Sequence, residues 1–137
     1  MTSIGILHPG AMGASLGAAL VANGHQVFWA SEHRSDATRE RADSDRLADA
    51  GTLAALADEV EVIVSVCPPA AATAVAASVA DLGFSGTYLD ANAVAPDRAR
   101  AAAAAVEAGG AVFVDGGIVG PPARDRGLTV LYLSGPD

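Results

Sequence analysis

Two glycines three positions apart, Gly10 and Gly13, separate an apolar run from a stretch of good helix formers. In the pattern Gly-x-Gly-x-x-Gly, the second glycine lets a pyrophosphate approach the backbone, and the third lets the helix pack closely on the preceding strand. Gly10 and Gly13 hold these two positions, whereas His8 stands at the first. The unpaired N–H groups at the start of the following helix suit a phosphate. The turn therefore predicts dinucleotide binding, with Ala11 and Met12 also beside the cofactor.

The position of this turn favours binding over its main alternative, a tight strand-to-helix connection without a ligand. The turn joins a predicted strand at 3–7 to a predicted helix at 11–22, and a second strand is predicted at 27–30. It is thus the first turn of a βαβ unit, where dinucleotide-binding folds hold the pyrophosphate. The His8 side chain is expected near the cofactor, at the carboxyl end of the first strand, but we interpret this residue as mainly structural.

Residues at the carboxyl ends of other predicted strands lie where a doubly wound sheet binds its ligands. We expect Cys67, Pro68 and Asn92 near the ribose and nicotinamide. Cys67 is interpreted as an inert thiol, because no His-Asp partner set accompanies it. Asn92 and Asp115 are candidates for hydrogen bonds to substrate or cofactor, and Asp115 is equally a candidate cap for the glycine loop that follows it.

Short β-branched or apolar runs alternate with helix formers along the chain. Strands are predicted at residues 3–7, 27–30, 60–66, 87–90, 111–115 and 128–133, and helices at residues 11–22, 35–49, 53–57, 70–80 and 96–108. The run at 60–66 is nearly all β-branched, which is typical of a central parallel strand covered by helices on both faces. The alternation predicts an α/β fold with a doubly wound, mainly parallel sheet, in one Rossmann-like domain over residues 1–137.

The composition excludes several classes of partner. The net charge of −8 opposes binding to nucleic acid and to anionic membranes. A single cysteine, Cys67, allows no intrachain disulfide and no metal cluster. The N-terminus has no cationic signal-peptide region. We therefore expect a cytoplasmic protein that binds a dinucleotide and a small-molecule substrate, without metal, nucleic acid or membrane.

Four stretches spread over the chain share a pattern with known proteins. They are Gly10-Ala11-Met12-Gly13, Asn23-Gly24-His25, Val64-Ser65-Val66-Cys67-Pro68 and Val114-Asp115-Gly116-Gly117-Ile118-Val119-Gly120-Pro121-Pro122. The chain resembles the superfamily of β-hydroxyacid dehydrogenases and 6-phosphogluconate dehydrogenases, and most closely its phosphogluconate-dehydrogenase-like and imine-reductase-like branches. This resemblance implies an NAD(P)-dependent oxidoreductase that transfers a hydride, with this chain as its cofactor-binding domain.

By the same resemblance, one stretch occupies the place of the family's substrate-binding loop. Its members are Asp115, Gly116, Gly117, Ile118, Val119 and Gly120. The hydroxyacid enzymes have a Ser where Val119 stands, and Ser-Thr where Asn92 and Ala93 stand. Both differences remove hydroxyls expected to meet a hydroxyacid carboxylate. An imine-reductase-like activity is therefore the alternative.

The segment after the second predicted strand bears on the choice of cofactor. An acidic residue there usually binds the ribose hydroxyls of NAD, whereas Arg accommodates the 2′-phosphate of NADP. By the family's spacing, Ser31 takes the ribose-facing position and Glu32 points away. Arg34, Ser31 and Ser35 are then expected to form a phosphate pocket, so we expect NADP, with NAD as the alternative. The competing interpretation of Arg34 is an exposed cation paired with a neighbouring carboxylate.

The resemblance also implies a helical C-terminal domain that supplies the dimer interface and the catalytic residue, commonly a Lys. All eight basic residues of this chain are Arg. We expect residues 1–137 to bind the cofactor but not to catalyse alone, and the full-length protein to be a homodimer. The rival interpretation, from a different functional class, is a non-catalytic dinucleotide-sensing module.

Overall fold

Strands β1 (Ser3–Leu7) and β4 (Val62–Ser65) lie side by side and parallel at the centre of the sheet. The structure is a computed structural model, and it describes residues 1–136. The other strands are β2 (Gln26–Trp29), β3 (Ala48–Asp49), β5 (Thr87–Asp90), β6 (Val112–Val119) and β7 (Val130–Ser134). They form one seven-stranded sheet in the order β3-β2-β1-β4-β5-β6-β7, parallel except for β7. Strand order reverses between β1 and β4, and such a switch point opens a ligand crevice at the carboxyl ends of the strands.

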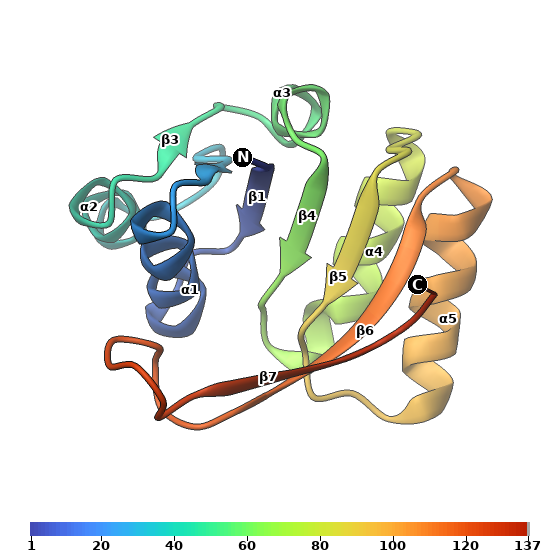
Figure 1. Cartoon of the computed structure of the whole chain (residues 1–137). Coiled ribbons are helices and arrows are strands. Elements are labelled where there is room, and N and C mark those ends of the chain that lie inside the picture. The colour runs from blue at the N-terminus through green and yellow to red at the C-terminus, as the bar shows by residue number, and fades with distance from the viewer. Residues whose placement is uncertain (137) are drawn as a thin grey trace.

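Helices cover both faces of this sheet (Figure 1). They are α1 (Ala11–Ala22), α2 (Asp36–Ser44), α3 (Leu53–Glu59), α4 (Ala72–Asp81, after a 3-10 turn at Pro69–Ala71) and α5 (Pro96–Ala108). Helices α3, α4 and α5 pack on one face with Ile63 and Tyr88, and α1 and α2 pack on the other with Ile6 and Val64. Ile63 and Val64 are consecutive, so β4 buries both faces, as a central parallel strand must.

The predicted α/β architecture is confirmed, and most predicted elements lie where expected. Four of them, β1, α1, β5 and α5, begin and end at the predicted residues. Thr52 caps α3, since its hydroxyl oxygen accepts a hydrogen bond from the Ala55 N–H at 3.1 Å. β4 is shorter than predicted. The predicted helix at 70–80 begins as a 3-10 turn.

The predicted helix at 35–49 is wrong in its second half. α2 ends at Ser44, and Arg46 adopts the left-handed conformation with φ of +61°. Leu47 then returns to the core and is 5% exposed. The chain continues as the edge strand β3, in which Ala48 pairs with Phe28. Burial of Leu47 therefore outweighs the helix propensity of the surrounding charged residues.

The predicted loop from Asp115 to Gly120 is also corrected, because β6 continues through it to Val119. The continuation has a partner in β7, which pairs antiparallel so that Asp115 opposes Ser134 and Val119 opposes Val130. β7 is the last strand of the sheet and exposes its large apolar side chains; Tyr132, for example, is 63% exposed.

Candidate functional site

The glycine turn leaves the start of α1 accessible to a ligand. Gly10 is the N-cap of α1 in extended conformation, and no side chain caps the helix. The first hydrogen bond of the helix runs from the Ala14 N–H to the Gly10 carbonyl oxygen at 2.8 Å. The N–H groups of Ala11, Met12 and Gly13 therefore have no helical partner, and they carry the positive end of the helix dipole.

His8 shapes the turn with its backbone. Its φ is +59°, in the left-handed region, and its carbonyl oxygen accepts a hydrogen bond from the Gly10 N–H at 2.6 Å. Left-handed backbone favours glycine, and histidine is among the side chains that adopt it more readily than most. His8 thus takes the conformation for which the usual first glycine of the pattern is suited. This confirms the structural part of the expectation for His8.

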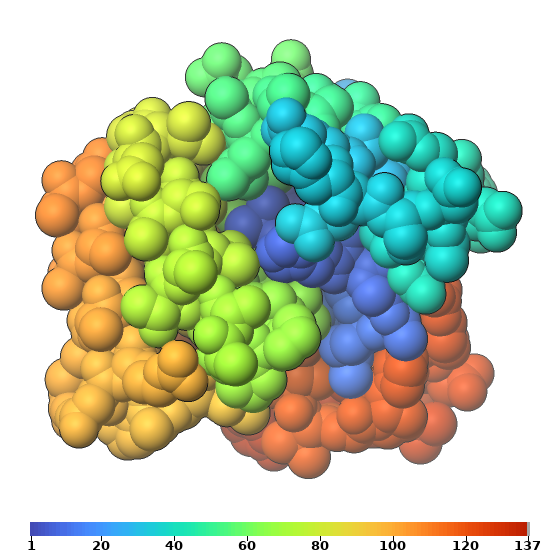
Figure 2. Space-filling view, turned by 180° about the vertical axis from the view of Figure 1, so that it is seen from behind, coloured from blue at the N-terminus to red at the C-terminus, as the bar shows by residue number. Residues whose placement is uncertain are grey.

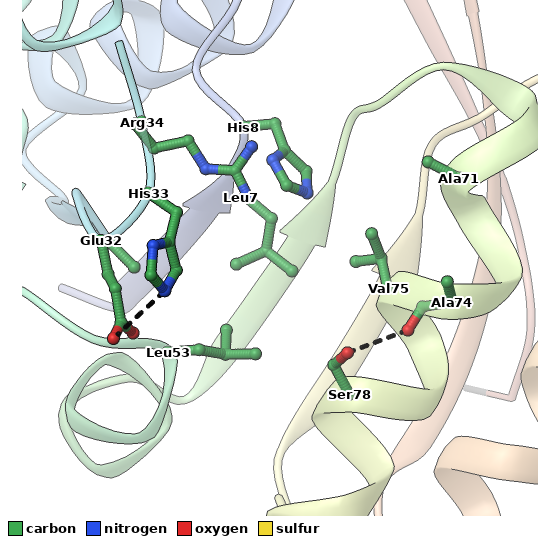
Figure 3. Close-up of a pocket in the computed structure, with 11 residues that line it drawn as sticks. Leu7, His8, Glu32, His33, Arg34, Leu53, Ala71, Ala74, Val75 and Ser78 are labelled. Carbon is green, nitrogen blue, oxygen red and sulfur yellow. Dashed lines mark hydrogen bonds and ion pairs between the residues drawn. The ribbon is translucent and has the colours of Figure 1, made fainter. Parts of the chain in front are cut away.

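A cavity of about 300 Å³ opens beside the turn (Figure 3). One wall comes from the loop after β2, where Glu32, His33 and Arg34 lie, and the opposite wall from α4. The full lining is Leu7, His8, Ala30, Glu32, His33, Arg34, Leu53, Ala71, Ala74, Val75 and Ser78. One wall is therefore charged or polar and the other is made of small and apolar side chains.

A second cavity, of about 390 Å³, lies over the turn itself. Its lining is His8, Gly10, Ala11, Met12, Gly13, Arg34, Thr38, Val66, Cys67 and Pro68. His8 and Arg34 line both cavities. Figure 2 shows the hollow from behind, with the dark blue N-terminal segment at its floor between the yellow-green α4 and the cyan segment after β2. The structure thus brings the glycine turn together with Arg34, Cys67 and Pro68.

Ser31 and Ser35 lie outside the linings of both cavities. The Ser31 N–H donates to Asp49 Oδ1 at 3.3 Å, and Asp49 also pairs with Arg39 at 3.3 Å. Partial burial opposes ionisation of Asp49, but the hydrogen bonds from Ser31 and Gly51 and the charge of Arg39 lower its pKa. The Ser35 hydroxyl oxygen caps α2 by accepting the Thr38 N–H at 3.2 Å. Of the three residues expected in the phosphate pocket, only Arg34 lines a cavity.

Glu32 also differs from its expected position. It was expected to point away from the ligand, but it lines the first cavity and lies 3.6 Å from His33 Nε2. Arg34 forms no ion pair with Glu32 or with any other carboxylate within residues 1–136. The Arg34 guanidinium is therefore not paired with a carboxylate, although Glu32 lines the same cavity.

Asn92 ties the ends of two strands together. Its Oδ1 accepts the Cys67 N–H at 2.7 Å, and its Nδ2 donates to the Ser65 hydroxyl oxygen at 3.1 Å. Its own N–H donates to Asp90 Oδ1 at 2.9 Å. Asn92 is 5% exposed, so it holds the Cys67-Pro68 segment from inside the protein, through the hydrogen bond to Cys67. Burial raises the pKa of the Cys67 thiol, which supports its interpretation as an inert residue.

The stretch from Asp115 to Gly120 lies away from both cavities. Asp115 is exposed on β6 and stands opposite Asp90 in the parallel pairing. Asp90 is fully buried, and its Oδ2 has no hydrogen-bond partner within the described residues. Burial, and after it the charge of Asp115, raise the pKa of Asp90. Asp115 lies within the continuing strand β6, so it does not begin a loop that it could cap.

Several residues that support the site were not found from the sequence. Arg41 on α2 donates from Nη1 to the carbonyl oxygen of Pro9 at 3.0 Å and so holds the turn from outside. Ser15, fully buried in α1, accepts the Ala123 N–H at 2.7 Å. The α4 wall, with Ala74 and Val75, belongs to an Ala-rich helix with no motif.

Other kinds of site are not seen in the described part of the chain. No group of three or more His, Cys, Asp or Glu side chains within residues 1–136 is placed to hold a metal ion. None of the helices in this range combines the length and apolar character needed to cross a bilayer.

Comparison with known proteins gives a family match. The model of the NAD-binding domain of 6-phosphogluconate dehydrogenase matches residues 3–136. A search of curated proteins found no match.

Many solved structures share the fold. The Mycobacterium tuberculosis 3-hydroxyisobutyrate dehydrogenase, solved with L-serine, has 22% identity and a TM-score of 0.86, over 100% of this chain and 47% of the other. A Streptomyces aurantiacus imine reductase has 21% identity and a TM-score of 0.82, over 98% and 47%. An Aspergillus terreus reductive aminase, solved with NADPH4, cyclohexanone and allyl amine, has 23% identity and a TM-score of 0.77, over 98% and 48%. The chain thus spans about half the length of each.

Proposed function

We propose a function from the premise that this chain belongs to the family of the NAD-binding domain of 6-phosphogluconate dehydrogenase. The chain is a dinucleotide-binding domain of Rossmann type, and its two adjoining cavities are the observation that carries the proposal. The pyrophosphate lies over the open N–H groups of Ala11, Met12 and Gly13. The absence of a Cβ at Gly10, where a side chain would meet only the His8 carbonyl oxygen at 3.9 Å, leaves room for it.

The first cavity is proposed to hold the adenosine. Its apolar lining includes Leu53 and Val75, which suit the face of an adenine ring, and Arg34 lines the same cavity. From there the ligand passes over the turn toward Cys67 and Pro68, at the carboxyl end of β4. The nicotinamide end of the ligand is thus proposed to lie at that edge of the sheet, with Asn92 positioning the segment rather than contacting the ligand.

Arg34 is proposed to select NADP over NAD. Its guanidinium lines both cavities and has no carboxylate partner within residues 1–136, so it is available to a 2′-phosphate. Asp49 lines neither cavity, and its carboxylate already accepts from Ser31, Gly51 and Arg39. A charge-assisted hydrogen bond of this kind contributes about 1.5–3 kcal/mol. NAD is the alternative.

Replacing Arg34 by Ala tests this choice. Titration of the full-length protein with NADPH and NADH should show weaker NADPH binding, by about tenfold or more, and little change for NADH. Arg98→Ala on α5, which contributes to neither cavity, is the matched control. An unchanged NADPH preference in Arg34→Ala would remove Arg34 from the site and favour the NAD alternative.

The full-length protein is proposed to be a hydride-transferring oxidoreductase. The bound nicotinamide supplies the hydride chemistry, and this domain binds and orients it. A helical C-terminal domain is proposed to supply the catalytic residue, the substrate contacts and a homodimer interface, since the solved relatives are about twice as long. The single free cysteine suits the reducing cytoplasm, where we propose the protein works.

An imine-reducing activity is the second candidate. Asn92 Oδ1 accepts from Cys67 and its Nδ2 donates to Ser65, and Val119 has no hydroxyl, so neither position offers the hydroxyl expected to meet a hydroxyacid carboxylate. The fold is also shared with imine reductases. Kinetics of the full-length protein on panels of imines, ketones and 3-hydroxyacids separate the two candidates. No NAD(P)H turnover on any panel would instead favour a dinucleotide-sensing role.

A further inference from the structure

We propose that His8 is a proton-linked contact for a phosphate group of the dinucleotide, so that ligand binding is coupled to uptake of a proton by its imidazole. The inference rests on the proposed function, because it assigns a role within the same site. His8 stands where the family pattern has a glycine, which has no side chain to contribute. It therefore adds a titratable group to a turn that otherwise binds phosphate through backbone N–H groups alone.

The His8 imidazole lies beside the space proposed for the phosphate groups. His8 lines both the cavity beside β2 and the cavity over the glycine turn, and within residues 1–136 Arg34 is the only other residue that lines both. Figure 3 shows the His8 ring beside the Arg34 guanidinium at the head of the first cavity. An anion between them would contact two cationic groups, one permanent and one available on protonation.

The backbone fixes this position. The left-handed φ of +59° and the hydrogen bond from Gly10 to the His8 carbonyl oxygen hold the residue at the junction of the two cavities. No described hydrogen bond engages the His8 ring nitrogens within residues 1–136, in contrast to His25, whose Nδ1 accepts the Thr2 N–H at 3.2 Å. Both nitrogens of His8 are therefore free to meet a ligand.

The charges around His8 favour its neutral form before a ligand binds. Burial lowers the pKa of His8, and the positive charge of Arg34, on the loop after β2, lowers it further. On the same loop, the Glu32 carboxylate is directed to His33 at 3.6 Å. From the end of β4, the Cys67 thiol stays neutral because burial raises its pKa.

On α2, Arg41 adds a cation that donates to the Pro9 carbonyl oxygen, next to His8 in the chain. The 3-10 turn before α4 and the helix itself face the cavity with Ala71, Ala74, Val75 and Ser78, without a titratable group.

A bound phosphate reverses this balance. Its negative charge lies beside Arg34 and His8 together, so it raises the pKa of His8 toward or above the ordinary value and the ring takes up a proton. The affinity then increases as the pH falls from the pKa of the bound state toward the lower pKa of the free state. Each pKa unit by which the ligand shifts His8 corresponds to about a tenfold gain in affinity across that interval.

The test compares His8→Asn with the full-length wild-type protein. Asn tolerates left-handed backbone and does not titrate, so the turn is kept while the proton is removed. A second variant, His8→Gly, restores the usual first glycine and relieves the backbone constraint. Dissociation constants for NADP⁺ and NAD⁺ are measured from about pH 5.5 to 8.5, the range in which histidine titrates. Calorimetry in buffers of different ionisation enthalpy counts the protons taken up.

The wild-type protein should gain affinity relative to both variants as the pH falls, and its proton uptake should be lost in both variants. Titration of the 2′-phosphate itself is common to all three proteins and cancels in the ratio. His33→Asn, which alters the other histidine of the cavity, should keep the proton uptake on binding, whatever its effect on the affinity itself. Parallel profiles for wild type and both His8 variants, or loss of the effect only in His33→Asn, would overturn the proposal.

The two cofactors identify the phosphate. An effect with NADP⁺ alone assigns His8 to the 2′-phosphate, and an effect with both assigns it to the pyrophosphate. Failure of the proposed function is distinguishable, because then none of the proteins binds either dinucleotide at any pH.

Discussion

Gly13 faces the carbonyl oxygen of His8 so closely that a Cβ built on Gly13 would lie 3.0 Å from that oxygen. The same Cβ would lie 3.4 Å from Cγ2 of Ile6, in the central strand. Backbone oxygen cannot rotate away as a flexible side chain can, so the helix and the turn would have to separate. Gly13 therefore sets the distance between α1 and β1, whereas Gly10 has open space on its ligand side.

These two glycines should separate folding from binding. Gly13→Ala should destabilise the protein by about 1–3 kcal/mol, the usual range for overpacking a close contact. Gly10→Ala should change stability by less than about 0.5 kcal/mol, because its φ of −71° suits alanine. It should nevertheless weaken dinucleotide binding, because the Cβ occupies the space proposed for the pyrophosphate. Urea unfolding and cofactor titration on both variants check this, and equal stability losses would contradict it.

Arg41 offers a test of positioning. Arg41→Ala removes the hydrogen bond to the Pro9 carbonyl oxygen and should loosen the turn without touching the ligand. We expect NADPH and NADH affinities to fall together, by about tenfold for a loss of 1.4 kcal/mol, with their ratio unchanged. Arg39→Ala, whose guanidinium pairs with Asp49 instead, is the matched control on the same helix. A change confined to NADPH would mean that Arg41 contacts the 2′-phosphate.

Asn92→Ala should be costly for stability. It removes two side-chain hydrogen bonds and leaves the Cys67 N–H without its acceptor in a site that is 5% exposed. A loss of about 1–3 kcal/mol is expected for such a buried group. Asn23→Ala, which removes an exposed bond to the Ala19 carbonyl oxygen, should lose less. Denaturant midpoints measure both, and comparable losses would show that Asn92 does not tie β4 to β5.

The buried Asp90 carboxylate predicts a pH dependence of stability. Its pKa is raised in the folded state, first by burial and then by the charge of Asp115. The folded protein therefore holds a proton that the unfolded chain releases, so this residue's contribution to stability is lost as the pH rises from the unfolded value through the raised one. Asp115→Asn removes one cause and should reduce that loss. Urea unfolding across acidic pH compares the two proteins, and superimposable stability curves would contradict the coupling.

Elements that begin or end at a proline or a glycine could be predicted from the sequence. Helix α5 begins at Pro96 and ends before Gly109, and α1 begins after the glycine turn, so their bounds were predicted correctly. The strand β3 and the far half of β6 could not be found in this way. Each is held by a partner distant in sequence, Phe28 for Ala48 and Leu131 for Ile118.

The candidate site also combines residues marked by a local motif with residues that only long-range contacts bring together. The turn that ends in Gly13 is a local signal, and Arg34, also singled out from the sequence, lines a cavity with it. Ser31, also expected at the phosphate, lies outside the linings of both cavities, and its N–H is bound by Asp49, a residue of the strand that the sequence did not reveal. The α4 wall of the first cavity, with Ala74 and Val75, meets Leu7 of β1 only in the folded protein, because these residues are far apart in the sequence. The Ala-rich sequence of α4 contains no motif that would predict this contact.

The apolar edge strand β7 has a practical consequence for handling the domain in solution. Leu131, Tyr132 and Leu133 are 37%, 63% and 61% exposed on the last strand of the sheet. A long edge with unpaired backbone groups and apolar side chains is a template for pairing with another chain. Residues 1–137 prepared alone should therefore self-associate with rising concentration, and Leu133→Lys should keep them dispersed. Light scattering of the two preparations measures their self-association, and equal particle sizes at every concentration would show that β7 does not cause it.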